Sequence, residues 1–350
     1  MPLLILIRML AVMLDLSSMA RYIGPMNLAA PHFRDDEAAR TYFEAIRWPD
    51  GRVCPHCGSI GSEYVTKRAG RYRCGAKECR KDFSTTTGTA MESSKVGLSK
   101  WLWTFYMMAS SKKGISSQQV HRSLGVSKDA AWFMCHRVRE AMKAGGLVAP
   151  LGGPGKVVEV DETYHGKISE ASGQYSKRKR GSTTKRGGSR RIGDKRAIVT
   201  LVERGGKSRS FHVAVADLPT VQKIVRENIA KESRLHTDGS GLYTAVGREY
   251  AEHAFVDHSK EEYVRYEPTG PVHNNSAESY FSVFKRGMRG VYQHCKEAHL
   301  HRYLVEFDFR HNTRTRLGVD DKQRADLALA GAEGKRLTYR RTNEGGHVAR

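Results

Sequence analysis

The chain has 350 residues, of which 39% are hydrophobic and 27% are charged. This length and apolar content allow two or three domains with at least one sizeable core, and such a chain should fold without disulfides. The formal net charge of +22, from 59 Lys and Arg against 37 Asp and Glu, is far from the balance of an ordinary soluble enzyme. A surplus of this size attracts polyanions, so nucleic acid is the expected partner and a membrane surface is disfavoured.

The first residues, from Met1 to Leu16, are strongly apolar. The run is shorter than the roughly 20 residues that span a bilayer, and Arg8 and Asp15 interrupt it. It matches a secretory signal peptide poorly. We therefore treat 1–30 as an N-terminal extension, either a peripheral helix or residues that precede a later start codon. Cysteine usage favours a reducing compartment, and we expect a cytoplasmic, nucleoid-associated protein.

Four of the six cysteines form a metal-binding pattern in a segment, 31–92, that is predicted to be a zinc ribbon with a preceding helix. Cys54 and Cys57 are followed after 16 residues by Cys74 and, after four more, by Cys79. Two thiolate pairs separated by a hairpin-length insert supply the four ligands of one tetrahedral Zn²⁺. The alternative is that two chance pairs pack as small apolar residues. The second pair is wider than the usual two-residue gap, so its turn geometry is less certain.

The insert between the cysteine pairs is basic. Around Tyr72 it carries Lys67, Arg68, Arg71 and Arg73. A hairpin that faces nucleic acid or protein and a purely structural ribbon both fit this composition. His56 lies inside the first pair, where a histidine more often faces solvent than replaces a metal ligand.

Residues 93–148 are predicted to form a helical domain. The run from Leu98 to Ala109 indicates a buried helix capped at Ser99. Two further helical patterns between Gly114 and Met142 are joined by a Leu-Gly-Val turn, which is typical of a helix-turn-helix. A plain helical hairpin between domains would look similar.

The second helix of this pair is predicted to begin after an N-cap at Ser127. The residues expected on its exposed face are Ser127, Lys128, Asp129, Arg137 and Arg139. We assign Lys128 to DNA contact, whereas Trp132 and Phe133 are interpreted as core residues.

After a hinge rich in Gly and Pro at 144–155, the pattern changes to strands. The predicted elements are strands at Val157–Tyr164, Arg196–Glu203 and Ser208–Val215, a helix at Thr220–Ala230, and strands at Arg234–Thr237 and His253–Val256. Three strands, then alternating helix and strand, then helices, is the order of an RNase H-like mixed α/β sheet. We assign this domain to 156–312, followed by a C-terminal helix and polar tail at 313–350.

Acids stand at or near the ends of two strands that can be neighbours in such a sheet. Asp161 lies in the first strand and Asp238 follows the fourth, 76 intervening residues later. If the helix that carries Glu278 packs across them, the three carboxylates can hold hard divalent cations, Mg²⁺ or Mn²⁺. Glu159 and Glu162 are nearby alternative ligands.

Each acid also has a structural interpretation. Asp238 precedes a glycine and could begin a turn. Glu278 stands three residues after Asn275 and could complete a capping box. Asp161 is harder to explain structurally, because a carboxylate in a buried apolar strand needs a partner or a metal.

The segment from Pro271 to Gln293 reads as one amphipathic helix at a period of 3.6 residues. One face carries Glu278, Ser282, Lys285 and Arg289, and another carries Phe281, Phe284, Met288 and Val291. The carboxylate therefore lies on a row of cations. We assign Arg286 and Arg289 to DNA contact.

The segment between the first two strands, from Lys167 to Lys195, is rich in Gly, Ser and basic residues. A solvated loop, disordered when free, is the ordinary interpretation. Beside an acidic metal site, such a loop would contact phosphates and become ordered on DNA. The cations assigned to this contact are Lys177, Arg178, Lys179, Arg180, Lys185, Arg186, Arg190 and Arg191.

Together these motifs resemble the zinc-ribbon group of bacterial and archaeal insertion-sequence transposases, members of the DDE class with a retroviral-integrase-like core. The matching segments are the ribbon Cys-Pro-His-Cys-Gly-Ser with Tyr72-Arg-Cys and Asp82-Phe-Ser, Thr87-Gly-Thr with Leu98-Ser-Lys-Trp, Val160-Asp-Glu-Thr-Tyr, His236-Thr-Asp-Gly, and His273-Asn-Asn-Ser-Ala-Glu with Phe284-Lys-Arg-Gly-Met-Arg-Gly-Val-Tyr. The likeness runs from about Phe33 to Arg340. The wider second cysteine pair and the apolar start depart from the family pattern.

The resemblance implies a catalytic triad of Asp161, Asp238 and Glu278, with Lys285 as the basic companion that holds a phosphate near the scissile bond. Two Mg²⁺ ions would be held by Asp161 with Asp238 and by Asp161 with Glu278. The ribbon and helix-turn-helix would recognise terminal inverted repeats. Because two element ends must meet, we expect a homo-oligomer on double-stranded DNA.

Two other function classes remain open at this point. One is a zinc-ribbon DNA-binding regulator in which the acids are structural. The other is an RNase H-like nuclease without strand transfer, which would share the metal chemistry.

Overall fold

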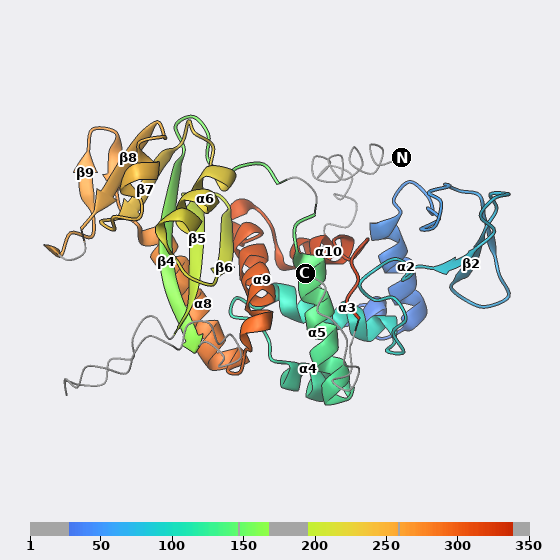
Figure 1. The fold of residues 1–350 in the computed structure, drawn as a ribbon. Coiled ribbons are helices and arrows are strands. Elements are labelled where there is room, and N and C mark those ends of the chain that lie inside the picture. Colours follow the sequence, from blue (N-terminus) through green and yellow to red (C-terminus); the bar gives the residue numbers. More distant parts are fainter. Residues whose placement is uncertain (1–27, 146–147, 168–194, 258–259, 339–350) are drawn as a thin grey trace. The chain divides into compact units, whose positions relative to one another are not determined.

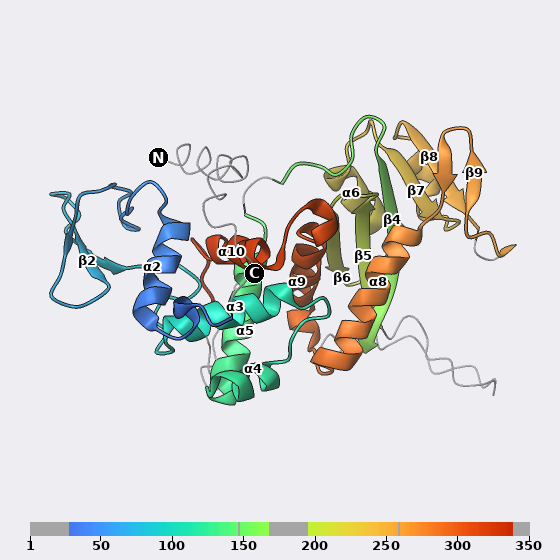
Figure 2. The same ribbon diagram turned by 180° about the vertical axis from the view of Figure 1, so that it is seen from behind.

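The computed structural model describes residues 28–145, 148–167, 195–257 and 260–338, and it divides into two compact units (Figures 1 and 2). Unit 1 contains the described residues of 1–110, 124–148 and 320–350, and unit 2 contains those of 111–123 and 149–319. The apolar start of the N-terminal extension and the basic-loop cations lie outside the described residues. In the part of the chain that is described, no helix combines the length and apolarity needed to cross a membrane.

Unit 1 joins a small antiparallel sheet to a group of helices. Its elements are the 3-10 turn η2 (Pro31–Phe33), α2 (Asp36–Arg47), β1 (Glu63–Val65), β2 (Arg71–Cys74), β3 (Asp82–Ser84), α3 (Leu98–Ser110), α5 (Lys128–Met142) and α10 (Asp321–Ala330). The strands pair in the order β1-β2-β3 around a core that includes Trp48, Tyr72 and Phe83. The apolar helix α3 contacts α2, α5 and α10.

Two helix starts in unit 1 test the predicted caps. Ser127 caps α5, because its side chain accepts a hydrogen bond from the backbone N–H of Ala130, as predicted. The predicted cap at Ser99 is wrong, because α3 begins at Leu98. The backbone N–H and the hydroxyl of Ser99 instead donate to Oδ1 of Asp36, at 2.8 and 2.6 Å. A carboxylate of α2 therefore supplies the acceptor at the start of α3.

The C-terminal helix packs within unit 1. The hydroxyl of Tyr42 donates to Asp326 at 2.6 Å, and the backbone N–H of Ala90 donates to the carbonyl of Ala332 at 2.9 Å. The sequence-based division treats 313–350 as a separate C-terminal segment. The C-terminal helix α10 belongs to unit 1, the unit that holds the ribbon.

Unit 2 is built on a five-stranded sheet. Its strands are β4 (Val157–Lys167), β5 (Lys195–Glu203), β6 (Ser208–Val213), β7 (Arg234–Asp238) and β8 (Glu252–Val256), with a hairpin of β9 (Arg265–Glu267) and β10 (Gly270–Val272). Its helices and helical turns are α6 (Leu218–Asn228), α7 (Thr244–Gly247), α8 (Asn275–Gly287), η6 (Met288–Tyr292), η7 (Glu297–His299), α9 (Leu300–Asn312) and η8 (Thr315–Leu317). Helix α4 (Ser117–Leu124) begins in unit 2, and its last residue falls in unit 1.

The strands of the large sheet lie in the order β6-β5-β4-β7-β8. Strands β6, β5 and β4 pair antiparallel, whereas β4, β7 and β8 pair parallel. The first and fourth predicted strands are therefore neighbours, which confirms the RNase H-like mixed α/β architecture. Every strand predicted for this sheet is present.

Helices cover both faces of the sheet (Figures 1 and 2), and buried apolar side chains lie between the helices and the sheet. On one face, Val158 and Val160 of β4 pack with residues of α6 and α7. On the other, Ile198 and Val202 of β5 pack with α8 and α9. Because side chains alternate along a strand, Asp161 points to the face that α8 covers.

The periodicity predicts one helix from Pro271 to Gln293, and this prediction is wrong. Pro271 and Val272 belong to β10, and Val272 is fully buried against β8 residues, which favours the extended pairing. Helix α8 begins only at Asn275, and a π-helical turn follows it. Of the predicted apolar face, Phe281, Phe284 and Met288 are buried, and Val291 is partly buried.

Part of the predicted hinge at 144–155 is anchored in unit 2. Leu151 is buried in the sheet core, where its backbone bonds to Asn228 and Ala230 at 2.8 and 2.9 Å. Gly152 follows with a φ of +87°, and a Cβ at this position would lie 2.0 Å from the hydroxyl oxygen of Ser233. The backbone here requires glycine for both conformation and space.

Gly152→Ala should destabilise the protein more than Gly153→Ala. Gly153 also has a positive φ, of +121°, but a Cβ there would meet nothing within 4 Å. Gly153→Ala should therefore lower the free energy of unfolding by about 1–3 kcal/mol, from backbone strain alone. Gly152→Ala should add an overpacking cost of about 1–3 kcal/mol. Urea unfolding of both variants measures the difference, and equal losses would contradict the close packing at Gly152.

Candidate active site and metal centre

The three acids predicted from the sequence come from neighbouring elements of unit 2. In the parallel pairing of β4 with β7, Glu159 is level with His236. Continuing this register by two residues brings Asp161 level with Asp238. Glu278 lies in the first turn of α8, which covers this face of the sheet. Two strands and one helix thus contribute one carboxylate each.

The electrostatics of Asp161 reflect the nearness of the other acids. The pKa of Asp161 is raised to about 8, mainly by burial and in addition by the charges of Asp238, Glu162 and Glu278. A carboxyl group with this pKa is largely protonated at neutral pH, and a cation beside it would favour the ionised form. The oxygen donors present therefore fit a hard divalent cation. Within the described residues, the acids are not gathered as closely as the ribbon cysteines are.

Two of the neighbouring acids also make structural contacts. Oδ1 of Asp238 accepts a hydrogen bond from the backbone N–H of Ser240 at 3.2 Å, which is the turn contact considered for this residue. The buried hydroxyl of Tyr243 donates to Glu162. Burial raises the pKa of Glu162, and the charge of Asp238 adds to the shift. Glu162 therefore lies near the acids while it holds Tyr243.

The start of α8 is capped from β4. The N-cap residue, Asn274, makes no side-chain capping hydrogen bond. Glu159, which is fully buried, instead accepts hydrogen bonds from the backbone N–H groups of Ser276 and Ala277, at 2.7 and 3.1 Å. The capping box considered for Glu278 is therefore wrong. No local pattern could have indicated the actual cap, because Glu159 and Ser276 lie 117 residues apart.

A buried polar network surrounds Glu159. Arg204 donates from Nε to Oε1 of Glu159 at 2.9 Å, and Nδ1 of His273 lies 3.3 Å from the same oxygen. Arg204 also donates to the carbonyl of Pro271 at 2.8 Å, and its guanidinium lies 3.1 Å from Nδ1 of His236. Burial lowers the pKa of His236 to about 4, and the charge of Arg204 acts in the same direction. A neutral ring can accept the hydrogen bond from Arg204.

Basic side chains gather further along α8. His165 of β4 is the register partner of Arg196, and its ring packs edge-on against Phe284 with centroids 5.5 Å apart. The pKa of His165 is lowered to about 4, mainly by burial and in addition by the charges of Arg196, Arg289 and Lys285. Lys285 follows Glu278 by seven residues, which is about 10 Å along a helix axis. One helix therefore carries an acid near its start and cations near its end.

Other predicted DNA contacts differ in exposure. Lys128, Arg286 and Arg289 are exposed. Arg139 is buried, with 2% of its surface exposed, and Arg137 donates to the backbone carbonyls of Glu92 and Leu337. The expectation that Arg137 and Arg139 face solvent is therefore wrong, because this part of α5 packs inside unit 1. The helix-turn-helix remains a prediction, since α4 and α5 are divided between the units.

Both residues interpreted as core in this helix, Trp132 and Phe133, are only partly buried. Trp132 packs edge-on against the buried ring of His136, with centroids 4.3 Å apart. Phe133 lies beneath the guanidinium of Arg137, whose central carbon is 4.5 Å from the ring centre. These aromatic side chains support the packing of α5 without reaching the fully buried core. The loop cations, Lys177 to Arg191, lie outside the described residues.

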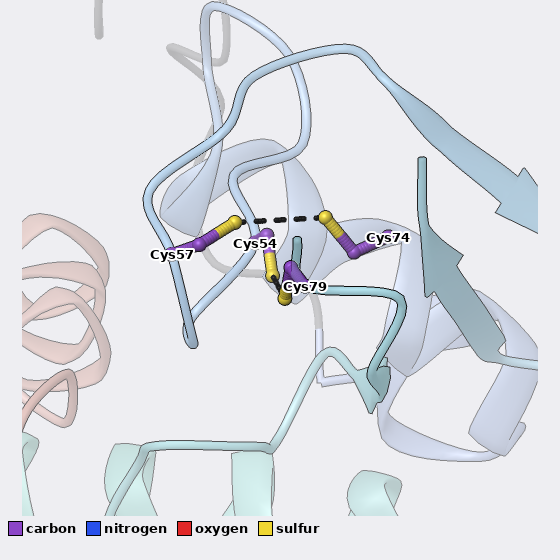
Figure 3. Close-up of side chains that lie close together, drawn as sticks. All are labelled: Cys54, Cys57, Cys74 and Cys79. Atoms are coloured by element: carbon purple, nitrogen blue, oxygen red, sulfur yellow. Dashed lines mark hydrogen bonds between the residues drawn. The ribbon is translucent and has the colours of Figure 1, made fainter. Parts of the chain in front are cut away.

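The four ribbon cysteines converge in unit 1 (Figure 3). Their ligand atoms lie within 4.8 Å of one another, with sulfur separations of 3.8 Å from Cys54 to Cys79 and 3.6 Å from Cys57 to Cys74. Tetrahedral zinc with Zn–S bonds of about 2.3 Å requires sulfur separations of about 3.8 Å. The four cysteines are free thiols, and these two sulfur separations match this geometry. The cluster fits one structural Zn²⁺.

The wider second cysteine pair forms a turn that resembles the first. The residue after Cys57 is Gly58, with a φ of +79°, and the residue after Cys79 is Arg80, with a φ of +48°. Each pair is therefore followed by a residue in the left-handed conformation. Glycine adopts this conformation freely, and arginine adopts it at a cost in free energy. His56 is exposed, as expected, and its Nε2 lies 3.3 Å from the carbonyl oxygen of Asp82.

The cations of the ribbon hairpin are exposed, whereas Tyr72 is buried. Lys67, Arg68, Arg71 and Arg73 are exposed. Tyr72 packs in the ribbon core and donates its hydroxyl to Glu44 at 2.6 Å. Tyr72 therefore secures the hairpin to α2 and is not an exposed stacking group.

Zinc should be present at one ion per chain and should be lost in Cys74→Ser. The ribbon core is small, so a chelator should unfold this segment while the sheet of unit 2 remains folded. Elemental analysis combined with amide hydrogen exchange measures both effects. Cys135→Ser is the matched control, because Cys135 is equally buried but lies in α5, outside the cluster. Much less than one zinc per chain would contradict the assignment.

Two family models match this chain. One is described as a transposase zinc-ribbon domain and matches residues 34–82. The other is described as an ISXO2-like transposase domain and matches residues 150–312. The second range begins one residue before Leu151, the residue that opens the core of unit 2.

Comparison with known proteins adds a relative and a solved structure. A Halobacterium salinarum protein, described as an uncharacterized protein in transposable element ISH50, is 30% identical over 294 residues, which are 79% of this chain and 91% of the relative. A chain of the simian T-cell lymphotropic virus intasome in complex with PP2A regulatory subunit B56 gamma is similar at 12% identity, over 54% of this chain and 63% of that chain, with a TM-score of 0.26. So weak a structural likeness carries no argument. The sequence matches and the cysteine cluster agree, and the chain belongs to the insertion-sequence transposases that combine a zinc ribbon with an ISXO2-like transposase domain.

Proposed function

We propose that this transposase binds the terminal inverted repeats of an insertion sequence and cuts and joins DNA strands at Asp161, Asp238 and Glu278. The observation that carries the proposal is the placement of Asp161 on β4, of Asp238 on the parallel neighbour β7, and of Glu278 in the first turn of α8. Carboxylates that lie close together on an RNase H-like sheet repel one another and destabilise the fold. A reaction that depends on bound cations would explain why these acids lie together.

Asp161 with Asp238, and Asp161 with Glu278, would hold two Mg²⁺ or Mn²⁺ ions. When bound, the ions would lower the pKa of an attacking water and stabilise the departing oxygen. Asp161 is the shared ligand in this assignment. Its half-buried position on β4 supports that role, because the strand fixes the carboxylate while the exposed Glu278 approaches from α8.

The proposed reaction has two in-line displacements at phosphorus. In the first, a water oxygen bonds to phosphorus at the element end, the bond to the 3′-oxygen breaks, and a free 3′-hydroxyl remains. In the second, that hydroxyl attacks a phosphate of target DNA and displaces a 3′-oxygen of the target strand. Lys285 would hold a phosphate near the scissile bond by its charge.

The substrate we propose is double-stranded DNA, bound along several basic surfaces. The ribbon and the helix-turn-helix would recognise the repeats. Lys128, Arg286, Arg289 and the loop from Lys177 to Arg191 would contact phosphates. Because two element ends must meet for transposition, we propose a homo-oligomer on DNA. A protein that acts on this substrate would be located at the nucleoid, in the cytoplasm.

Asp161→Asn, Asp238→Asn and Glu278→Gln should each lower Mg²⁺-dependent nicking of a labelled terminal-repeat duplex by at least about a hundredfold, because each removes a charge that holds a cation. Binding of the duplex should be unchanged. Glu227→Gln is the matched control for Glu278→Gln, because Glu227 is an exposed carboxylate on α6, on the opposite face of the sheet. Normal nicking by Glu278→Gln with loss in both aspartate variants would place the third ligand elsewhere.

DNA affinity should fall steeply with salt, because Lys and Arg release counterions when they neutralise phosphates. Replacing Lys177, Arg178, Lys179 and Arg180 by Ala should reduce the log–log slope by about 0.9 for each phosphate that these side chains neutralise. Lys223→Ala, at an exposed lysine of α6, should leave the slope unchanged. A slope unaffected by the fourfold change would exclude phosphate binding by these loop residues.

A further inference from the structure

We propose that Glu159 is a positioning residue whose buried carboxylate sets the place of Glu278 relative to Asp161 and thereby controls cation binding at the site. The inference rests on the proposed function of the three acids. Glu159 precedes Asp161 by two residues and lies on the same face of β4, about 6.6 Å along the strand. Its carboxylate oxygens bind the start of α8, so its effect on the site would pass through that helix.

The carboxylate of Glu159 connects two elements that carry different acids. Oε2 of Glu159 accepts from the backbone N–H groups of Ser276 and Ala277, and Oε1 accepts from the hydroxyl of Ser276 at 3.0 Å. Glu278 directly follows Ala277 in the chain. One side chain thus fixes the strand of Asp161 to the helical turn of Glu278.

This contact determines the rotation of α8 as well as its distance from the sheet. Successive residues of an α-helix are separated by about 100° of rotation and 1.5 Å of rise. If another pair of backbone N–H groups were bound to Glu159, Glu278 would turn away from Asp161 by about 100° or more. Holding Ser276 and Ala277 therefore selects the one rotation of α8 that is observed.

Glu159 can stay buried because its negative charge has partners that offset the loss of hydration. An isolated carboxylate with no exposed surface would be strongly destabilising. Here Arg204 pairs with it, and the partial positive charge at the start of α8 favours a negative group. Arg204 also donates to the carbonyls of Pro271 and His273, which lead into α8. The network thereby holds the approach to the helix as well as its first turn.

The sequence suggests a different role for Glu159, as an alternative metal ligand. The observed contacts oppose that role, because both oxygens already accept hydrogen bonds from Arg204, Ser276 and Ala277. A ligand would have to give up the cap of α8 to bind a cation. The positioning role and the ligand role make opposite predictions for a charge-neutral replacement.

The test compares Glu159→Gln with wild-type full-length protein, by measuring nicking of the labelled terminal-repeat duplex across a range of Mg²⁺ concentrations. Gln keeps the size and one acceptor oxygen but loses the charge that pairs with Arg204. The Mg²⁺ concentration for half-maximal nicking should rise by about 10–100-fold, as for other residues that orient metal ligands. Nicking should recover in part at high Mg²⁺, and duplex binding should be unchanged.

Two further variants separate positioning from stability. Ser276→Ala removes only the hydroxyl contact with Glu159, so it should shift the Mg²⁺ dependence in the same direction by a smaller factor. Glu306→Gln is the matched control, because Glu306 is as fully buried and pairs with Arg310 on α9. It should lower the thermal midpoint without changing the Mg²⁺ concentration for half-maximal nicking.

The outcomes distinguish this inference from the proposed function. Wild-type Mg²⁺ dependence in Glu159→Gln, measured on folded protein, would overturn the positioning role. Complete loss of nicking at every Mg²⁺ concentration, matching Asp161→Asn, would overturn it in favour of the ligand role. Nicking by Asp161→Asn itself would overturn the proposed function of the acids, and the inference with it.

Discussion

The start of α8, the helix that carries Glu278, is held by one buried contact, between the carboxylate of Glu159 and the backbone N–H groups of Ser276 and Ala277. The sheet alone can bring Asp161 and Asp238 together, because parallel pairing fixes their register. The third acid arrives on a helix, and a helix can slide and rotate on an apolar face. A charge-assisted cap from the neighbouring strand removes that freedom, since unsatisfied N–H groups at a buried helix start are costly.

Helix α8 separates opposite charges along its length. Its first turn lies beside carboxylates, and its last turns carry Lys285 and Arg286, an arrangement that the helix dipole favours at both ends. Under the proposed function, the acids would hold cations and the basic groups would contact the DNA strand. Burial is the main cause of the raised pKa of Asp161 and of the lowered pKa of His165, and the charges beside each residue act in the same direction as burial.

The fold was largely predictable from the sequence, and the exceptions have local causes. Buried strands read clearly because apolar residues alternate or run together between turn residues, and the cysteine spacing indicates the ribbon directly. The predicted helix from Pro271 was too long because Val272 is buried more effectively in a hairpin than in a helical turn. The cap of α3 was misplaced because its acceptor, Asp36, comes from another helix.

The sequence by itself determined the zinc ribbon, the RNase H-like strand order, and the family to which the chain belongs. It identified Asp161, Asp238 and Glu278 as candidates because residue type and position are visible in one dimension. Only the tertiary structure decided what Glu159 does, since its partners are distant in the chain and its hydrogen bonds depend on packing. It likewise buried Arg139, which a helical pattern alone had placed in solvent. Periodicity shows which residues share a face, but only packing decides what covers that face.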